Sequence, residues 1–283
     1  FSYVNIAMRD LVKVLICGDK GVGKSTFVNV LATGSFSMCL DDLSFDQSAL
    51  PEIFLPSDLS EDGLDTLLWD SSINERYELV SYISEANVVL ILYDTKGLDN
   101  LENLWLPLVR RYRKDVPVAL IRNKIDLLDE ENNFASEEKY SKLNLLKKKF
   151  KVQGLLDCSC KTQEGVEQTL MFSHMMVIFP IAPLQNIETS ELKPLYKRAL
   201  LRIFRIFDED KDGLWSDREL KNFQKSCFET ELWDSHILSI KMLLGESVKN
   251  GKVLFEGLCK MMVLFIERSQ LFPVWRILEV FNF

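Results

Sequence analysis

One eight-residue stretch constrains what this chain can fold into more than any other feature. Residues 18–25 read G-D-K-G-V-G-K-S and match the phosphate-loop pattern G-x-x-x-x-G-K-[ST]. A β-branched apolar run precedes the stretch, and a pattern of helical spacing follows it. Glycines let the backbone curl so that successive N–H groups face an anion, and a helix N-terminus adds partial positive charge. We therefore interpret the stretch as a nucleotide-binding loop rather than a glycine turn with an incidental lysine.

The first 180 residues alternate apolar runs with helical patterns. Five apolar runs predict strands that are covered on both faces: residues 12–18, 66–70, 87–94, 116–124 and 154–159. Four stretches between them have helical spacing: residues 24–31, 101–114, 136–150 and 166–179. This order is typical of a parallel, doubly wound α/β sheet. The acidic segment 41–61, with its two prolines, predicts a loop plus an edge strand.

A second, all-helical domain is expected after this sheet. Pro180 and Pro183 end the last helix of the first part, and residues 184–190 have the composition of a linker. Five helical patterns follow: residues 191–207, 217–228, 234–245, 255–269 and 274–281. We therefore expect one domain over residues 8–181 and another over residues 190–283.

Composition excludes several classes of protein. Apolar residues make up 47% of the chain and aromatic residues 11%, enough to build a core, so a disordered chain is excluded. The net charge of −8 argues against nucleic-acid binding. The apolar stretches are too short or too interrupted to insert into a membrane. Six cysteines without metal-ligand spacing indicate reduced thiols, and a first residue that is Phe rather than Met predicts a fragment of a longer protein.

The phosphate-loop pattern assigns roles to individual residues. Lys24 is expected to reach the β- and γ-phosphates of a nucleotide and to act in catalysis, while Ser25 is expected to hold Mg²⁺. Asp70, which ends a predicted strand, is expected to bind the same ion through water. The residues expected at the phosphate site are Gly18, Gly21, Val22, Gly23, Lys24, Ser25 and Thr26.

Two further stretches predict which base the nucleotide carries. Residues 123–126 read N-K-I-D and end a predicted strand, at the edge where such sheets bind ligands. The Asp126 carboxylate can accept hydrogen bonds from guanine N1–H and the exocyclic amine, a donor pair that adenine lacks. Residues 159–161 follow the last predicted strand, where a backbone N–H near Cys160 can meet guanine O6. Asn123 is expected to tie this loop to the phosphate loop, and the Lys124 stem to cover the base plane. The complete set expected at the base site is Asn123, Lys124, Asp126, Ser159, Cys160 and Lys161.

In these motifs the first 180 residues resemble the Ras-like small GTPases, which implies GTP or GDP with Mg²⁺ as ligands. One departure concerns hydrolysis. That family follows the strand-ending Asp with x-x-Gly-Gln, whose Gln orients the attacking water, whereas residues 71–74 read S-S-I-N. Asn74, one methylene shorter than Gln, is the residue expected in the catalytic position. No clear switch threonine is present, and Ser44 and Ser48 are both candidates. The sequence therefore predicts slow hydrolysis.

A twelve-residue stretch predicts a calcium site in the second domain. Residues 208–219 read D-E-D-K-D-G-L-W-S-D-R-E and fit the EF-hand loop at every liganding position, whereas a solvated acidic turn would need no such match. Leu214 is expected to contribute its carbonyl, Ser216 to act through water and Glu219 to bind with both oxygens. The complete expected ligand set is Asp208, Asp210, Asp212, Leu214, Ser216 and Glu219.

A second helix–loop–helix unit, or EF-hand, is expected to pair with the first one without binding metal. EF-hands pair through a short strand at loop position 8, which is Trp215, and residues 253–255 offer a matching strand. The loop over residues 246–252 contains one acid and two lysines, so it lacks the carboxylates of a calcium cage. The sequence thus predicts one metal site and one silent hand.

A Ras-like domain followed directly by such a pair resembles the mitochondrial Rho GTPase (Miro) family. Three local stretches support the resemblance: I-F-L-P at residues 53–56, P-I-A-P-L at 180–184 and F-Q-K-S-C-F at 223–228. The closing residues look like the family's short helix that docks on the silent hand, with Trp275, Leu278 and Phe281 expected on one face.

The resemblance implies a GTP-binding switch coupled to a calcium-binding module on the cytosolic face of the mitochondrial outer membrane. Motor-adaptor proteins and a GTPase-activating protein are the implied partners, and a second GTPase domain, a second EF-hand unit and an anchor would belong to a longer chain. Two alternatives stay open. One is a non-hydrolysing scaffold that nucleotide merely stabilises, and the other is a calcium-gated enzyme of the ordinary Ras type, which the missing Gly-Gln pair disfavours.

Five lysines lie between residues 142 and 151, at the end of a predicted helix. We interpret them as the solvated face of a helix rather than a phosphate or lipid surface. On this interpretation Leu143, Leu145 and Leu146 face inward.

Overall fold

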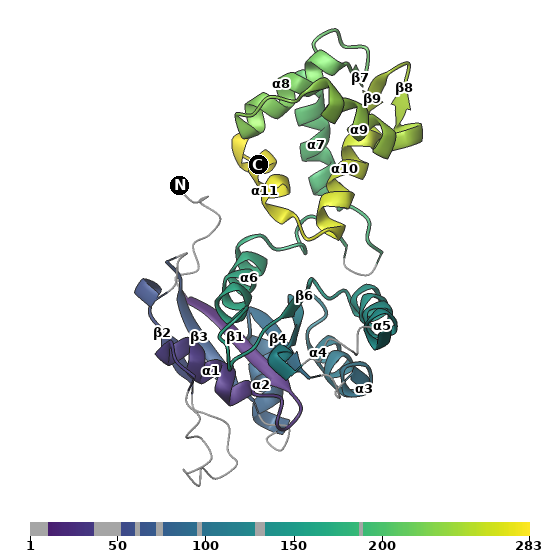
Figure 1. Ribbon diagram of the computed structural model, residues 1–283. Helices are drawn as coiled ribbons and strands as arrows, with labels where there is room; N and C mark the ends of the chain where they lie inside the picture. Colours follow the sequence, from purple (N-terminus) through teal and green to yellow (C-terminus); the bar gives the residue numbers. More distant parts are fainter. Residues whose placement is uncertain are drawn as a thin grey trace. The chain divides into compact units, whose positions relative to one another are not determined.

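The computed structural model describes residues 11–36, 52–59, 63–71, 76–94, 98–127, 134–186 and 189–283, and Figure 1 shows their elements. The chain divides between Ile178 and Phe179 into two compact units. We call the first the α/β unit and the second, which contains residues 179–283, the helical unit. Within the described ranges, no helix combines the length and the apolar character needed to cross a membrane.

The α/β unit is built on a six-stranded sheet in the order β2-β3-β1-β4-β5-β6. Its strands are β1 (Leu11–Gly18), β2 (Ile53–Leu55), β3 (Asp65–Asp70), β4 (Val88–Tyr93), β5 (Val118–Arg122) and β6 (Gly154–Asp157). All neighbours are parallel except β2, which pairs antiparallel with β3 at the edge. The predicted parallel sheet and its edge strand are therefore confirmed.

Helices cover both faces of this sheet (Figure 1). They are α1 (Lys24–Thr33), α2 (Arg76–Glu85), α3 (Leu98–Asn100), the π-helical turn η3 (Leu101–Trp105), α4 (Leu106–Tyr112), α5 (Phe134–Phe150) and α6 (Val166–Ile178). The single helix expected over residues 101–114 is thus a π turn continued by α4. The sequence analysis does not predict α2, because among its residues of described burial, 78–85, the fully buried side chains are just Leu79 and Ile83.

The core lies on both sides of the sheet, because its central strands are apolar at successive positions. In β4, Val88, Leu90 and Leu92 pack in the layer that contains α1 and α6. Val89 and Ile91 pack in the opposite layer, with α2, α4 and α5. All five side chains are at most 1% exposed. This burial fixes the strands, so that their carboxyl ends present loops along one edge.

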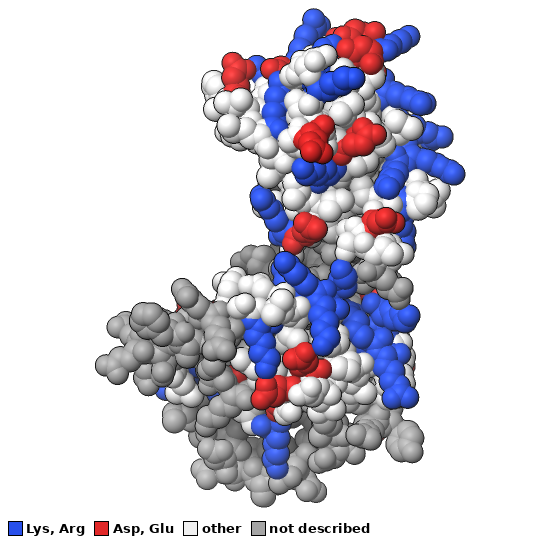
Figure 2. Space-filling model, turned by 90° about the vertical axis from the view of Figure 1, so that its right-hand side faces the viewer, with Lys and Arg blue, Asp and Glu red and all other residues white. Residues whose placement is uncertain are grey.

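Helix α5 exposes Lys148 and Lys149 to solvent as expected, whereas Lys142 and Lys147 are partly buried. Leu143 and Leu146 are buried, but Leu145 is 66% exposed, so the expectation that it faces inward is wrong. At 100° per residue, Leu145 falls on the side opposite Leu143. Lys142 pairs with Asp99 at 2.7 Å, and Lys149 pairs with Glu102 at 2.9 Å. Figure 2 shows this side of the α/β unit, where Lys and Arg side chains gather.

The helical unit consists of two helix–loop–helix hands and a closing helix. Its elements are α7 (Pro194–Phe207), β7 (Leu214–Trp215), α8 (Asp217–Phe228), α9 (Asp234–Leu244), the 3₁₀ turn η6 (Gly245–Ser247), β8 (Val248–Lys249), β9 (Lys252–Leu254), α10 (Phe255–Glu267) and α11 (Leu271–Val280). The buried Trp215 indole stacks on Phe204 with ring centroids 4.7 Å apart and donates to the Phe204 carbonyl at 2.9 Å. Phe223 of α8 packs on the same indole. One side chain therefore joins α7, β7 and α8.

The closing helix α11 packs against both α8 and α10. Its buried face consists of Leu271, Val274, Ile277 and Leu278. Of the three residues expected on one face, Leu278 is buried, whereas Trp275 and Phe281 are partly buried at its margin, because the buried stripe runs at i, i+3, i+6 and i+7 from Leu271. Phe281 packs edge-on against Phe207 of α7. Arg276 donates to the Cys227 carbonyl near the end of α8 at 3.3 Å, where a cation offsets the helix dipole.

Candidate nucleotide and calcium sites

The phosphate loop leaves β1 at a point where only glycine fits. Gly18 has a φ of +145°, and a Cβ on it would lie 2.2 Å from the Leu92 carbonyl oxygen. Gly23, just before α1, has a φ of +95°, and a Cβ on it would lie 2.5 Å from Asn123 Nδ2. These close approaches place the loop against β4 and against the loop predicted to bind the base.

All residues predicted for the phosphate site lie in this loop or in the first turn of α1. The Lys24 ammonium crosses the loop and donates to the carbonyl oxygens of Gly18 at 2.9 Å and Asp19 at 3.0 Å. Burial lowers the pKa of Lys24, and the nearby Asp70 carboxylate opposes this shift. Both present acceptors are neutral, so a phosphate oxygen would offer Lys24 a stronger, charge-assisted bond.

Ser25 and Asp70 meet at the position expected for magnesium. Ser25 Oγ donates to Asp70 Oδ2 at 2.6 Å. Asp70 is 5% exposed, and its other oxygen, Oδ1, has no hydrogen-bond partner in the described part of the chain. Burial raises the pKa of Asp70, while the Ser25 bond and the Lys24 charge lower it. A buried, unpartnered carboxylate oxygen beside a hydroxyl fits a hydrated Mg²⁺, whose water can donate to it.

Asn123 joins the phosphate loop to both base loops. Its Nδ2 donates to the Val22 carbonyl at 2.9 Å, and its Oδ1 accepts from the Cys160 backbone N–H at 3.2 Å. The side chain is buried, so these bonds compete little with water. Asn123 therefore links the phosphate loop to the loop after β6. The Cys160 N–H, however, is already used to hold Asn123, so a guanine O6 would need a different donor close by.

The Asp126 carboxylate is oriented by residues of the loop after β6. Its Oδ1 accepts from Ser159 Oγ at 2.6 Å, and its Oδ2 lies 3.9 Å from Lys161 Nζ. Lys124 has a φ of +65° and donates from Nζ to the Gly21 carbonyl at 2.6 Å. The oriented Asp126 carboxylate is suited to bind the edge of a guanine ring, and the aliphatic stem of Lys124 is suited to cover its face.

Two residues that the sequence analysis missed hold the phosphate loop from outside. Asp19 Oδ1 accepts from Trp105 Nε1, and Asp19 Oδ2 accepts from Asn100 Nδ2, both at 2.9 Å. Trp105 ends the π-helical turn and is 1% exposed. The phosphate-loop pattern allows any residue at the position of Asp19, so the motif could not predict this contact.

The predicted switch residues lie outside the described residues. Asn74, the expected catalytic residue, and the candidates Ser44 and Ser48 all fall in the gaps between the described ranges. The structure resumes at α2, which starts at Arg76. The predicted roles of these residues therefore remain predictions.

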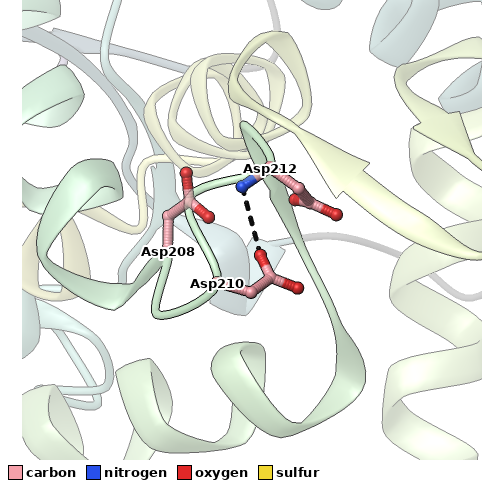
Figure 3. Close-up of side chains that lie close together, drawn as sticks. All are labelled: Asp208, Asp210 and Asp212. Carbon is pink, nitrogen blue, oxygen red and sulfur yellow. Dashed lines mark hydrogen bonds between the residues drawn. The ribbon is translucent and has the colours of Figure 1, made fainter.

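Three aspartates of the predicted calcium loop lie together between α7 and α8 (Figure 3). One carboxylate oxygen from each of Asp208, Asp210 and Asp212 lies within 4.8 Å of the other two. Asp208 is 9% exposed, and its Oδ1 has no partner among the described residues. Asp212 Oδ1 accepts from the Leu214 backbone N–H at 2.8 Å, which shapes the loop. An unpartnered buried oxygen beside two further carboxylates fits a calcium ion.

Glu219, expected to close the calcium cage, is engaged at the start of α8. Its Oε1 accepts from the Glu209 backbone N–H at 2.8 Å, and its Oε2 accepts from Ser216 N and Oγ at 2.7 Å. Ser216 and Glu219 thus form a capping box. Burial acts to raise the pKa of Glu219, but these hydrogen bonds lower it below its ordinary value. The carboxylate is held beside the loop, and it would have to exchange these hydrogen bonds in order to bind an ion.

The second hand pairs with the first through the expected strand. Strand β9 runs antiparallel to β7, with Val253 opposite Trp215. Strands β8 and β9 are joined at Asn250 and Gly251, which both have positive φ, as a two-residue hairpin turn requires. The loop over residues 246–252 is therefore largely a hairpin. In the ranges that the structure describes, the second hand gathers no group of three metal-ligating side chains.

Comparisons with known proteins agree with this geometry. The Ras family model matches residues 13–177. Mitochondrial Rho GTPase 1 of Mycosarcoma maydis is 30% identical over 313 residues, covering 98% of this chain and 41% of that protein. Mitochondrial Rho GTPase 1 of Caenorhabditis elegans is 30% identical, covering 96% of this chain and 43% of the relative.

A plant relative shows the same pattern. Mitochondrial Rho GTPase 2 of Arabidopsis thaliana is 32% identical over 280 residues, covering 96% of this chain and 42% of that protein. The chain thus spans about two-fifths of the length of the curated relatives it matches. The resemblance to mitochondrial Rho GTPases that the motifs indicate is confirmed, and the chain belongs to the Ras family.

Proposed function

We propose that this chain is a slow GTPase switch of the mitochondrial Rho type, which binds GTP or GDP with Mg²⁺ and carries one calcium site. The Ras family match and relatives that align over nearly the whole chain support the GTPase assignment. One observation carries the proposal furthest. Asn123 bonds both to the phosphate loop and to the loop that holds Asp126, so Lys24 and Asp126 belong to one connected site.

Each residue of this site has one role in the proposed mechanism. The N–H groups of the phosphate loop and Lys24 bind the β- and γ-phosphates and stabilise the charge that develops during transfer. Ser25 would hold Mg²⁺ through its hydroxyl, and Asp70 would hold it through water. Asp126 selects guanine by accepting two hydrogen bonds from the base edge. Mg²⁺, when bound, offsets charge on the phosphate oxygens.

Hydrolysis is slow on this proposal because the residue that orients the attacking water has been replaced. Asn74 stands in place of Gln with a shorter reach, and the preceding glycine that senses the γ-phosphate is Ile73. A partner that supplies an arginine raises such rates by ~10³–10⁵ where the site accepts it. The alternative scaffold, which nucleotide only stabilises, requires that no GTP is turned over.

The calcium site adds a second input to the same chain. Asp208, Asp210 and Asp212 would supply side-chain oxygens to the ion, and Glu219 would complete the site by giving up its capping-box hydrogen bonds. Sensor hands respond by opening an apolar groove for a target. Helix α11 already packs on α8 and α10, so we expect the ion to order the loop without a large rearrangement.

The cellular setting follows from the relatives, which are named mitochondrial Rho GTPases. We infer that the full protein acts at the cytosolic face of the mitochondrial outer membrane. There its nucleotide state would control the binding of motor-adaptor proteins. Comparing adaptor binding by the GTP- and GDP-loaded forms separates this switch from the constitutive scaffold.

Single-turnover hydrolysis of GTP by the full chain, with Mg²⁺, tests the proposal. We expect slow conversion to GDP, no conversion by Lys24→Ala, and faster conversion by Asn74→Gln. Tight GTP binding without any turnover in the unmodified chain would favour the scaffold. A rate typical of an assisted GTPase, with no partner present, would contradict the role given to residues 71–74.

A further inference from the structure

A lysine of the second hand reaches the calcium loop of the first. Lys252 begins β9, and its Nζ donates to Asp210 Oδ2 at 2.9 Å and to Asp212 Oδ2 at 2.5 Å. Its side chain is 30% exposed. The two aspartates stand at loop positions 3 and 5 and belong to the carboxylate cluster drawn in Figure 3. The second hand thus supplies a positive charge to the predicted metal site of the first.

The register of the small sheet fixes this reach. Because Val253 lies opposite Trp215, Lys252 is placed just beyond the β7–β9 pairing, beside the first loop. Lys249 lies across the hairpin from Lys252 and is exposed. Among the interactions of the described residues, none joins Lys249 to the calcium loop, so it offers a matched comparison on the same hairpin.

The carboxylate oxygens of Glu219 and Asp208 do not bond to Lys252. They accept hydrogen bonds from their own hand, except for one oxygen that has no partner among the described residues. Glu219 is held by N–H groups and the hydroxyl of its own hand. Asp208 Oδ2 accepts from the Gly213 backbone N–H at 3.0 Å, and its Oδ1 is the buried oxygen without a partner. Lys252 is therefore the cation that offsets the two more exposed carboxylates of the loop.

We propose that Lys252 is a built-in competitor for calcium at residues 208–219, so that the ion binds by displacing the lysine ammonium. This inference rests on the proposed calcium site and adds a role for the silent hand. That hand binds no metal of its own on this proposal, but its lysine sets the affinity of its partner.

Elementary electrostatics gives the direction of the effect. A calcium ion and an ammonium that share the same carboxylates repel each other, and the repulsion adds to the cost of binding the ion. The carboxylates must also turn from Lys252 toward the ion. The lysine can leave because its four-carbon stem is flexible and its ammonium is strongly hydrated in water. Removing the charge should therefore strengthen calcium binding.

Calorimetric titration of the full chain with CaCl₂, at fixed ionic strength, tests this inference. We expect Lys252→Met to raise the calcium affinity by about tenfold, which two exposed ion pairs of ordinary strength can supply together. Lys252→Arg keeps the charge and should stay close to the unmodified chain. Lys249→Met removes an equal charge from the same hairpin and should change the affinity far less.

Thermal unfolding in EGTA provides the second readout. Without calcium, Lys252→Met should unfold at a lower temperature than Lys249→Met, because the loop carboxylates lose their counterion. With excess calcium, that deficit should vanish.

The outcomes separate this inference from the calcium site itself. An unchanged or weaker affinity in Lys252→Met overturns the competition and leaves the calcium site in place, and a weaker one shows that Lys252 orients the ligands. If Lys252→Met binds calcium while the unmodified chain and the other variants do not, the competition is supported in its strongest form. Absence of binding in every variant overturns both the calcium site and the competition.

Discussion

Replacing Asp126 with alanine removes the side chain that we assign to the edge of the guanine base. In the structure this carboxylate is 13% exposed and accepts a 2.6 Å hydrogen bond from Ser159 Oγ. The substitution leaves the phosphate loop untouched, because Asn123 rather than Asp126 bonds to Val22. The change therefore isolates recognition of the base from binding of the phosphates.

The size of the effect follows from the charge and burial of this carboxylate. Guanine N1–H and the exocyclic amine would each donate to a charged acceptor, and their loss leaves both donors unpaired. Two such hydrogen bonds to a charged acceptor contribute about 2–4 kcal/mol to the free energy of binding, after the exchange of hydrogen bonds with water is included. At about 1.4 kcal/mol per tenfold, the affinity for GDP should fall ~30- to 1,000-fold.

Calorimetric titrations with GDP and with ADP measure this effect. ADP has no matching donor pair, so it should bind the unmodified chain and Asp126→Ala alike. Ser159→Ala is the control, because it removes the orienting bond and keeps the charge, and it should cost GDP only about 1 kcal/mol. Unchanged GDP affinity in Asp126→Ala, or an equal loss for ADP, would refute the assignment of Asp126 to the base.

Three further predictions concern other parts of the molecule. Calorimetry should find one calcium ion per chain and nearly none after Glu219→Gln, with little change in solution scattering, whereas two ions per chain would contradict the silent second hand. In metal-free protein, burial raises the pKa of Asp70 above its ordinary 3.8. The folded protein should therefore lose stability as the pH rises from 3.8 through the pKa that Asp70 has in the folded state. Urea unfolding of Asp70→Asn, measured in EDTA, should not show this loss. Trp105→Phe removes the donor to Asp19 and should lower the free energy of unfolding by about 1–3 kcal/mol, and an unchanged urea midpoint would show that this bond contributes nothing.

The parts of the site that could be predicted from sequence are those set by local chemistry at strand ends. Gly18 and Gly23 are needed wherever the backbone approaches a neighbour this closely, so their spacing marks the loop before any fold is known. Asn123 follows a buried strand, and parallel strands bring such positions to one edge. Residues 208–219 carry their whole ligand pattern within one loop.

Contacts between distant segments could not be predicted in the same way. Trp105 meets Asp19 across 86 positions of sequence, through a π turn that no pattern indicates. Lys252 reaches the calcium loop only because the register of β9 places it there. Side-chain direction on short helices is equally hard to infer, since α11 buries Ile277 and leaves Trp275 half-buried. These features depend on tertiary packing, which overrides local pattern.

The most direct measurement for a guanine-nucleotide switch is the relative affinity of the unmodified chain for GDP and ADP, with Mg²⁺ present. We predict a strong preference for GDP, set by Asp126 within the site that Asn123 connects. Mg²⁺ should add to the affinity for GDP in the unmodified chain and should add much less in Ser25→Ala. Equal affinity for the two nucleotides would contradict the assignment of this site to guanine.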